Sequence, residues 1–168
     1  MASRAAFLDK STPRTALLLA LGMAGVVGTA LLFQHVGGYM PCKLCLEQRT
    51  PYYLGVPLML LAALTAGRNR TISRAMLTAG GLLMFYGLSI AAYHAGIEWA
   101  WWPGPTDCSA VSTNVTNDAK TLLDDLNAIR PPSCDKAALR ILGLSMAGWN
   151  VPASLTLMLV AFRAAWKA

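Results

Sequence analysis

Two cysteines, Cys42 and Cys45, stand in the segment Pro-Cys-Lys-Leu-Cys, which lies in a short polar gap between two long apolar runs. Thiols at this spacing are near neighbours, so they can form and break a disulfide bond with little movement of the backbone. Arg49 follows four residues after Cys45, and an adjacent cation lowers the pKa of a thiol and raises its thiolate fraction. The segment therefore predicts a redox-active pair at a membrane boundary, where electrons leave the thiols for an acceptor dissolved in the lipid.

A second pair, Cys108 and Cys134, is separated by 26 positions. A disulfide that closes the 4-residue loop of the first pair is worth about 2 kcal/mol, and one that closes the 27-residue loop of the second about 3.5 kcal/mol. Because two predicted membrane helices already hold the ends of the first loop, a purely structural bond explains Cys42 and Cys45 poorly and Cys108 and Cys134 fairly. Zinc is a weaker alternative, since the second pair lacks the close spacing of a ligand pair, and we predict no metal.

The active interpretation uses both pairs in series. One disulfide accepts electrons from a protein dithiol in solution, and exchange between the pairs passes the electrons on through a mixed disulfide. No flavin, haem or nicotinamide motif is visible, so we expect an acceptor from outside the chain, and a quinone in the bilayer fits the position of Cys42 and Cys45. Arg49 is placed to stabilise negative charge on the quinone oxygens; its alternative role is that of an interfacial arginine.

The elements that must position these residues are membrane helices. Only 13% of the 168 residues are charged and the mean hydropathy is +0.47, whereas a soluble domain carries about 25% charged residues. Four segments approach the roughly 20 apolar residues that a spanning helix needs: residues 15–33, 51–67, 75–95 and 144–161. The predicted fold class is therefore an all-α membrane protein, with residues 1–168 as a single domain, a four-helix bundle and external loops at 34–50 and 96–143.

The basic residues predict the orientation of this bundle. Eight of them fall on one side: Arg4, Lys10, Arg14, Arg68, Arg70, Arg74, Arg163 and Lys167. Basic loops stay cytoplasmic, so both termini are predicted inside and all four cysteines outside, in a compartment where disulfides persist. This topology explains the net charge of +6, and we expect the lipid bilayer rather than nucleic acid as the partner of the basic residues.

The second external loop contains two apolar stretches. Leu122, Leu123, Leu126 and Ile129 have helical spacing, and residues 138–142 form a further apolar patch before the last span. We predict that such pieces are short interfacial helices that lie on the membrane surface.

In combination, these motifs resemble the bacterial disulfide bond formation protein DsbB family. The matching segments are Pro-Cys-Lys-Leu-Cys-Leu-Glu-Gln-Arg at 41–49, Tyr-His at 93–94, Trp-Trp-Pro-Gly-Pro-Thr-Asp-Cys at 101–108 and Pro-Ser-Cys-Asp at 132–135. The resemblance covers nearly the whole chain. It implies a four-helix quinone reductase of the bacterial inner membrane, which uses ubiquinone or menaquinone to reoxidise a soluble, DsbA-like oxidant in the periplasm.

The resemblance also implies roles for single residues at the quinone. By position, Cys45 is similar to the cysteine that engages the quinone, and Cys42 to its partner. Arg49 and His94 are similar to the arginine and the histidine beside the quinone head group. Lys43, between the two cysteines, departs from the apolar residue of the best-known members of the family, which affects redox tuning rather than the reaction.

For the second pair, the resemblance implies that Cys108 forms the mixed disulfide with the soluble partner and that Cys134 resolves it. Three alternatives stay open at this point. One is a non-enzymatic membrane scaffold with two structural disulfides. The second is a reductase that runs in the opposite direction, and the third is a vitamin K epoxide reductase-like or dedicated-partner thiol oxidoreductase.

Overall fold

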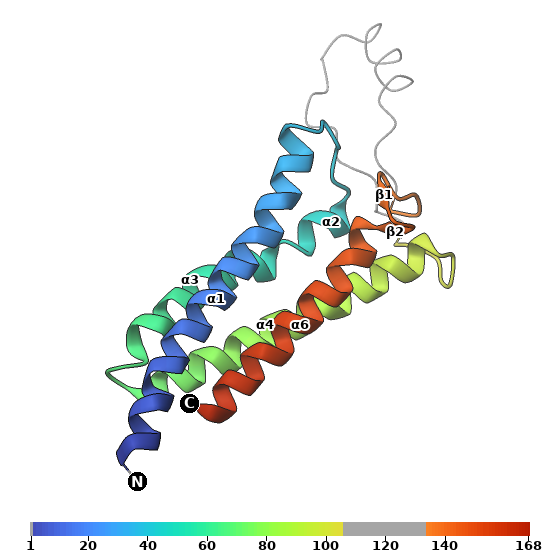
Figure 1. Cartoon of the computed structure of the whole chain (residues 1–168). Coiled ribbons are helices and arrows are strands. Elements are labelled where there is room, and N and C mark those ends of the chain that lie inside the picture. The colour runs from blue at the N-terminus through green and yellow to red at the C-terminus, as the bar shows by residue number, and fades with distance from the viewer. Residues whose placement is uncertain (1, 106–133) are drawn as a thin grey trace, which may run out of the picture.

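The computed structural model describes the backbone of residues 2–105 and 134–168, and the side chains from residue 12 onward within those ranges. Its elements are α1 (Ala2–His35), α2 (Lys43–Glu47), α3 (Thr50–Thr65), α4 (Arg70–Glu98), β1 (Arg140–Ile141), β2 (Leu144–Ser145) and α6 (Met146–Lys167). The four long helices form an elongated bundle (Figure 1), in which α4 packs along α6, and α3 along both α1 and α4. Both termini lie at one end of the bundle; we call the opposite end, which holds α2 and the two strands, the α2 end.

Each of the four predicted spans corresponds to a helix. Two described helical segments, Thr12–His35 and Arg70–Glu98, are long and apolar enough to cross a membrane, with mean hydropathies of 2.3 and 1.6. Large apolar side chains such as Leu18, Leu64 and Phe85 are more than half exposed on the outside of the bundle. Soluble proteins rarely expose large apolar surfaces to water. The chain is therefore a mainly helical membrane protein. The number of four spans stays a prediction, since α3 has only 16 residues.

Two residues that favour helix N-termini explain where α6 and α3 begin at the α2 end. Ser145 caps α6, because its hydroxyl accepts a hydrogen bond from the Gly148 N–H at 3.0 Å. Pro51 stands in the first turn of α3, where its missing N–H costs no hydrogen bond. The start of α3 at Thr50 separates it from α2, so that Arg49 lies at the junction between the two helices.

Small residues allow the helices to pack closely. Gly80 and Gly81 of α4 are buried, and a Cβ at Gly81 would lie 2.7 Å from a ring carbon of Phe162 on α6. A Cβ at Gly80 would lie 2.4 Å from the Met59 methyl group on α3. Small residues at such contacts are typical of packed membrane helices. This packing joins α4 closely to both α3 and α6.

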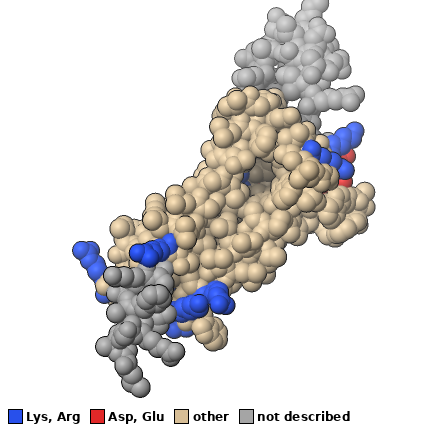
Figure 2. All heavy atoms as spheres, in the orientation of Figure 1, with Lys and Arg blue, Asp and Glu red and all other residues tan. Residues whose placement is uncertain are grey.

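The charged side chains divide between the two ends of the bundle. In Figure 2, the side chains drawn in colour at the end that holds the termini include Lys and Arg but no acidic residue, whereas blue and red side chains occur together toward the α2 end. Arg70 and Lys167 belong to the first group, and the Arg70 guanidinium donates a hydrogen bond to the Lys167 carbonyl at 3.1 Å. The division accords with the charge pattern in the sequence, while the orientation across the membrane stays a prediction.

The second loop departs from the all-helical expectation where the structure describes it. Residues 140–145 form an antiparallel hairpin, in which Arg140 pairs with Ser145 and Ile141 with Leu144. Leu142 and Gly143 both have positive φ values, 53° and 84°, as a two-residue hairpin turn requires. The prediction of an interfacial helix at 138–142 is therefore wrong, because the turn at Gly143 favours a hairpin. The helix predicted around residues 122–129 lies outside the described residues.

Candidate active site

The loop between α1 and α3 brings Cys42 and Cys45 together. Cys42 is the N-cap of α2, and its Sγ accepts a hydrogen bond from the Cys45 N–H at 3.3 Å. The two Sγ atoms are 3.0 Å apart and belong to free thiols, which share a hydrogen bond. Cys42 is buried, whereas Cys45 is half-buried and lines a cavity. The pair is thus held in reach of disulfide formation, with its two sulfurs in different surroundings.

These surroundings separate the acidities of the two thiols. The hydrogen bond with the Cys45 thiol holds the pKa of Cys42 well below its usual range; burial opposes this shift, and contact with His94 adds to it. The same shared hydrogen bond, followed by burial and the charge on Cys42, raises the pKa of Cys45. In the reduced pair, Cys42 is therefore the thiolate and Cys45 the thiol that keeps its proton.

His94 approaches Cys42 from the last turns of α4. Its Nε2 atom lies 3.8 Å from the Cys42 Sγ and 3.8 Å from Oε1 of Glu98, one helical turn further on. Its Nδ1 atom lies 2.7 Å from Nε2 of Gln48. His94 is only 2% exposed and does not line the cavity beside Cys45. The histidine that the resemblance associates with a quinone thus contacts the buried thiol of the pair.

Cys134 lies next to the same buried thiol. Its sulfur, the Cys42 sulfur and a ring nitrogen of His94 all lie within 4.8 Å of one another. Cys134 is disulfide-bonded, and its partner is neither Cys42 nor Cys45, because both of these are free. Cys108 lies outside the described residues. The structure therefore places a disulfide sulfur beside a free cysteine sulfur, which is the arrangement that thiol–disulfide exchange requires.

The same three residues have the chemistry of metal ligands, since Cys and His bind zinc. The ligand must be a thiolate, however, and the sulfur of Cys134 is committed to its disulfide bond. Of these three residues, only Cys42 and His94 are then available as ligands, and two are too few for a structural zinc site. The geometry thus favours redox chemistry over metal binding in this oxidation state of Cys134.

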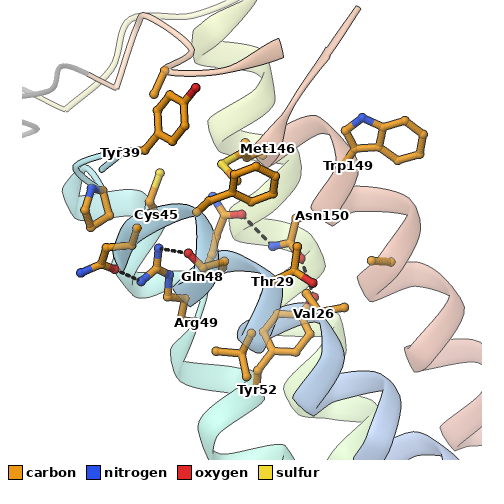
Figure 3. Close-up of a pocket in the computed structure, with 18 of the residues that line it drawn as sticks. Val26, Thr29, Tyr39, Cys45, Gln48, Arg49, Tyr52, Met146, Trp149 and Asn150 are labelled. Atoms are coloured by element: carbon orange, nitrogen blue, oxygen red, sulfur yellow. Dashed lines mark hydrogen bonds between the residues drawn. The ribbon is translucent and has the colours of Figure 1, made fainter. Parts of the chain in front are cut away.

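A mostly apolar cavity of about 370 Å³ opens beside Cys45 (Figure 3). It lies between α1, the start of α3 and the start of α6, and a hollow is visible near the α2 end in Figure 2. The apolar residues of its wall include Val26, Val27, Ala30, Phe33, Met40, Ile141, Met146 and Ala153. Its volume is in the range of small-molecule sites, which combine apolar walls with a few polar groups. The cavity is therefore suited to a small, mainly apolar molecule.

Arg49 supplies the positive charge of this cavity. Its guanidinium donates one hydrogen bond to Oε1 of Gln34 and another, at 3.5 Å, to the carbonyl of Ala30. Both partners belong to α1 and also line the cavity. The two contacts fix the side chain across the helix junction, so that Arg49 and Cys45 both lie on the cavity wall (Figure 3). The sequence alone indicated that these two residues are close in the chain.

Three further polar residues of the site were missed in the sequence. Gln48 accepts a hydrogen bond from Asn150 at 2.7 Å, and Asn150 accepts one from the Tyr52 hydroxyl. All three are buried. Asn150 offered a signal, because an amide inside an apolar segment of a membrane protein is costly unless it has a partner.

The fold and the site together define a class: a helical membrane protein that holds a reactive dithiol next to a disulfide and an apolar cavity. The family model "Disulfide bond formation protein DsbB" matches residues 12–164, and the chain belongs to this family. No solved structure matches the chain.

Individual relatives agree with this assignment. A protein from Saccharophagus degradans named Disulfide bond formation protein B is 30% identical over 155 residues, which cover 88% of this chain and 89% of the relative. A protein of the same name from Cupriavidus necator is 36% identical over 81 residues, and here the match spans about half of each chain (48%).

Proposed function

We propose that this protein is a protein-dithiol:quinone oxidoreductase of the bacterial inner membrane. In this proposal it oxidises a soluble, DsbA-like partner in the periplasm and passes the electrons to ubiquinone or menaquinone, which sustains disulfide formation in exported proteins. The observation that carries the proposal is the two-sided position of the dithiol. Cys42 contacts the disulfide sulfur of Cys134, and Cys45 lines a cavity that contains Arg49.

The first half of the reaction is exchange between cysteine pairs. A thiolate of the soluble partner attacks Cys108, which breaks its bond to Cys134 and releases the Cys134 thiolate. When Cys42 and Cys45 are oxidised, this thiolate attacks Cys42 and expels Cys45. Attack of Cys108 on Cys134, after the second partner thiol has released Cys108, restores the second disulfide and frees Cys42. The net result moves two electrons from the partner to the pair, which is left with a proton on Cys45 and a thiolate at Cys42. The separation of at most 4.8 Å between the sulfurs of Cys42 and Cys134 supports the central step.

The second half is oxidation of the reduced pair by the quinone. A new bond forms between the sulfurs of Cys42 and Cys45, and the pair gives up two electrons to the quinone. The proton held by Cys45 and a second proton taken up from water complete the conversion to the quinol. The proton shared across the 3.0 Å contact between the sulfurs allows Cys45 to become the thiolate when Cys42 takes the proton. The guanidinium of Arg49 stabilises the negative charge on the quinone oxygen in the transition state. The apolar wall and the volume of the cavity support a quinone ring as the occupant.

The proposal includes four spans with both termini in the cytoplasm and the α2 end in the periplasm. The packing of α3 and α6 along the two long apolar helices supports this number. The gathering of Lys and Arg at the end that holds the termini supports the direction. This topology exposes the second loop to a soluble partner and keeps the cavity at membrane depth.

The test uses the full chain in liposomes with and without ubiquinone, together with a reduced DsbA-like protein. We expect quinol formation that is lost in Cys45→Ser and in Cys108→Ser. Thiol labelling in the absence of quinone should then find newly reduced cysteines, because the electrons have no outlet. Cysteines that stay oxidised with and without quinone would instead identify a structural scaffold, and turnover by both variants would refute the mechanism.

A further inference from the structure

Four buried polar side chains form a continuous hydrogen-bonded row at the α2 end. Tyr52 on α3 donates to Oδ1 of Asn150 on α6, and Nδ2 of Asn150 donates to Oε1 of Gln48 at 2.7 Å. Nε2 of Gln48 in turn lies 2.7 Å from Nδ1 of His94 on α4. Each of the four side chains is at most 9% exposed. The row therefore joins α3 and α6 to the histidine of α4 that contacts the Cys42 sulfur. Figure 3 shows Tyr52, Asn150 and Gln48 of this row.

The row has a direction, because an amide presents an oxygen that accepts and a nitrogen that donates. Oδ1 of Asn150 accepts from Tyr52, so the amide nitrogen of Asn150 is left to donate to Gln48. The oxygen of Gln48 is thereby occupied, and its nitrogen faces His94. Nδ1 of His94 must accept this hydrogen bond, so the proton of the neutral imidazole resides on Nε2.

The proton on Nε2 faces the dithiol. Nε2 lies 3.8 Å from the Cys42 sulfur and 3.8 Å from the Glu98 carboxylate. The sulfur of Cys134, which belongs to a disulfide, lies within 4.8 Å of the Cys42 sulfur and of a His94 ring nitrogen. Cys45 is a further titratable group that faces Cys42. With this tautomer His94 can donate to the Cys42 thiolate, whereas the opposite tautomer would present a lone pair to a negative sulfur.

We infer that Gln48 and Asn150 are positioning residues that hold neutral His94 with its proton on Nε2, so that His94 donates a hydrogen bond to the Cys42 thiolate. His94 then stabilises the reduced pair instead of acting as the base that removes its proton. The consequence for turnover rests on the proposed function, but the tautomer does not. Neither positioning residue touches a sulfur that reacts, and the effect of Asn150 passes through Gln48 to His94.

Asn150→Asp tests this inference with little change in shape. A carboxylate at this position accepts from Tyr52 as before but has no N–H for Gln48. The Gln48 amide is then expected to turn, so that its nitrogen donates to the carboxylate and its oxygen faces His94. His94 should respond by moving its proton from Nε2 to Nδ1. Gln48→Glu should produce the same exchange by a different route, because it places an acceptor against Nδ1.

The measurement is the ¹⁵N NMR spectrum of the two imidazole nitrogens in the full chain in detergent, with His35→Gln to assign the signals. We expect the wild-type His94 to carry its proton on Nε2 and both variants to carry it on Nδ1. The pH midpoint of the Cys42 thiolate should rise by about one unit, a tenfold change in its equilibrium. Tyr52→Phe is the matched control, since Ser154 also donates to Oδ1 of Asn150; this variant should lose stability and keep the tautomer.

A wild-type proton on Nδ1, or a tautomer that both variants leave unchanged, would overturn the inference. The same holds if the Tyr52→Phe control shifts the tautomer as much as the two variants do. If the tautomer behaves as expected but the wild-type chain forms no quinol, the proposed function fails and the positioning role stands.

Discussion

The acidity of Cys42 gives the most direct test of how the site works. The hydrogen bond with the Cys45 thiol is the largest cause that lowers the pKa of Cys42, so Cys45→Ala should raise that pKa. A hydrogen bond to a charged group is worth about 1.5–3 kcal/mol, and one pKa unit corresponds to about 1.36 kcal/mol. The pH midpoint of the Cys42 thiolate should therefore rise by about one to two units.

The sign follows from the direction of the shift. A thiol with a lowered pKa is a thiolate above that pKa, and the thiolate is lost as the pH falls through it. The parent protein should thus keep one thiolate per chain at neutral and mildly acidic pH. Cys45→Ala should lose it at a higher pH, because the thiolate has lost its strongest hydrogen-bond partner.

The assay is the ultraviolet absorbance of the thiolate in reduced protein as the pH is lowered. Cys108→Ser and Cys134→Ser in the background leave only one cysteine pair, and Cys42→Ser in the same background gives the baseline. Glu47→Gln is the matched control, since this exposed residue of α2 is not a cause of the shift. A parent midpoint near that of an ordinary thiol, about 8.5, or a midpoint that Cys45→Ala does not move, would refute the reasoning.

Three further substitutions test the cavity and the packing. Arg49→Met should raise the apparent KM for quinone about tenfold or more, because one charge-assisted contact is lost. The variant should still oxidise the soluble dithiol in a single turnover. An unchanged dependence of the rate on quinone concentration would contradict the role of Arg49. Gly81→Ala should lower the free energy of unfolding by about 1–3 kcal/mol, because the added methyl group overpacks against Phe162. Gly28→Ala is the control and should be neutral or slightly stabilising, since the space at its Cβ is open. Equal effects of the two substitutions in thermal melts in detergent would count against the packing argument. Tyr52→Phe should cost about 1–2 kcal/mol of stability, since a buried hydrogen bond is lost, and an unchanged melting temperature would argue against that bond.

The relation between sequence and structure differs between parts of the molecule. Long apolar segments correctly indicated the helices, because each buries its own backbone hydrogen bonds and needs no distant partner. The hairpin at Leu142 and Gly143 was missed, since an apolar pattern of five residues does not separate a strand from a helix and the positive φ of Leu142 has no sequence signal. Arg49 was recognised from its distance to Cys45 along the chain, but its fixed position depends on Gln34 of α1.

The sequence by itself determined that Cys42 and Cys45 are neighbours, because a separation of three positions along the chain limits the distance between their sulfurs. It did not determine which of the two is the thiolate, since the spacing treats both sulfurs alike. The tertiary structure contributes to that assignment by placing His94, 52 positions away, against Cys42, where it adds to the lowering of the pKa that the Cys45 thiol causes. The hydrogen bond between Gln48 and Asn150, which are 102 positions apart, is likewise determined by the tertiary structure. Such contacts exist only when separate helices pack together, and electrostatic differences between two equivalent groups arise from these contacts.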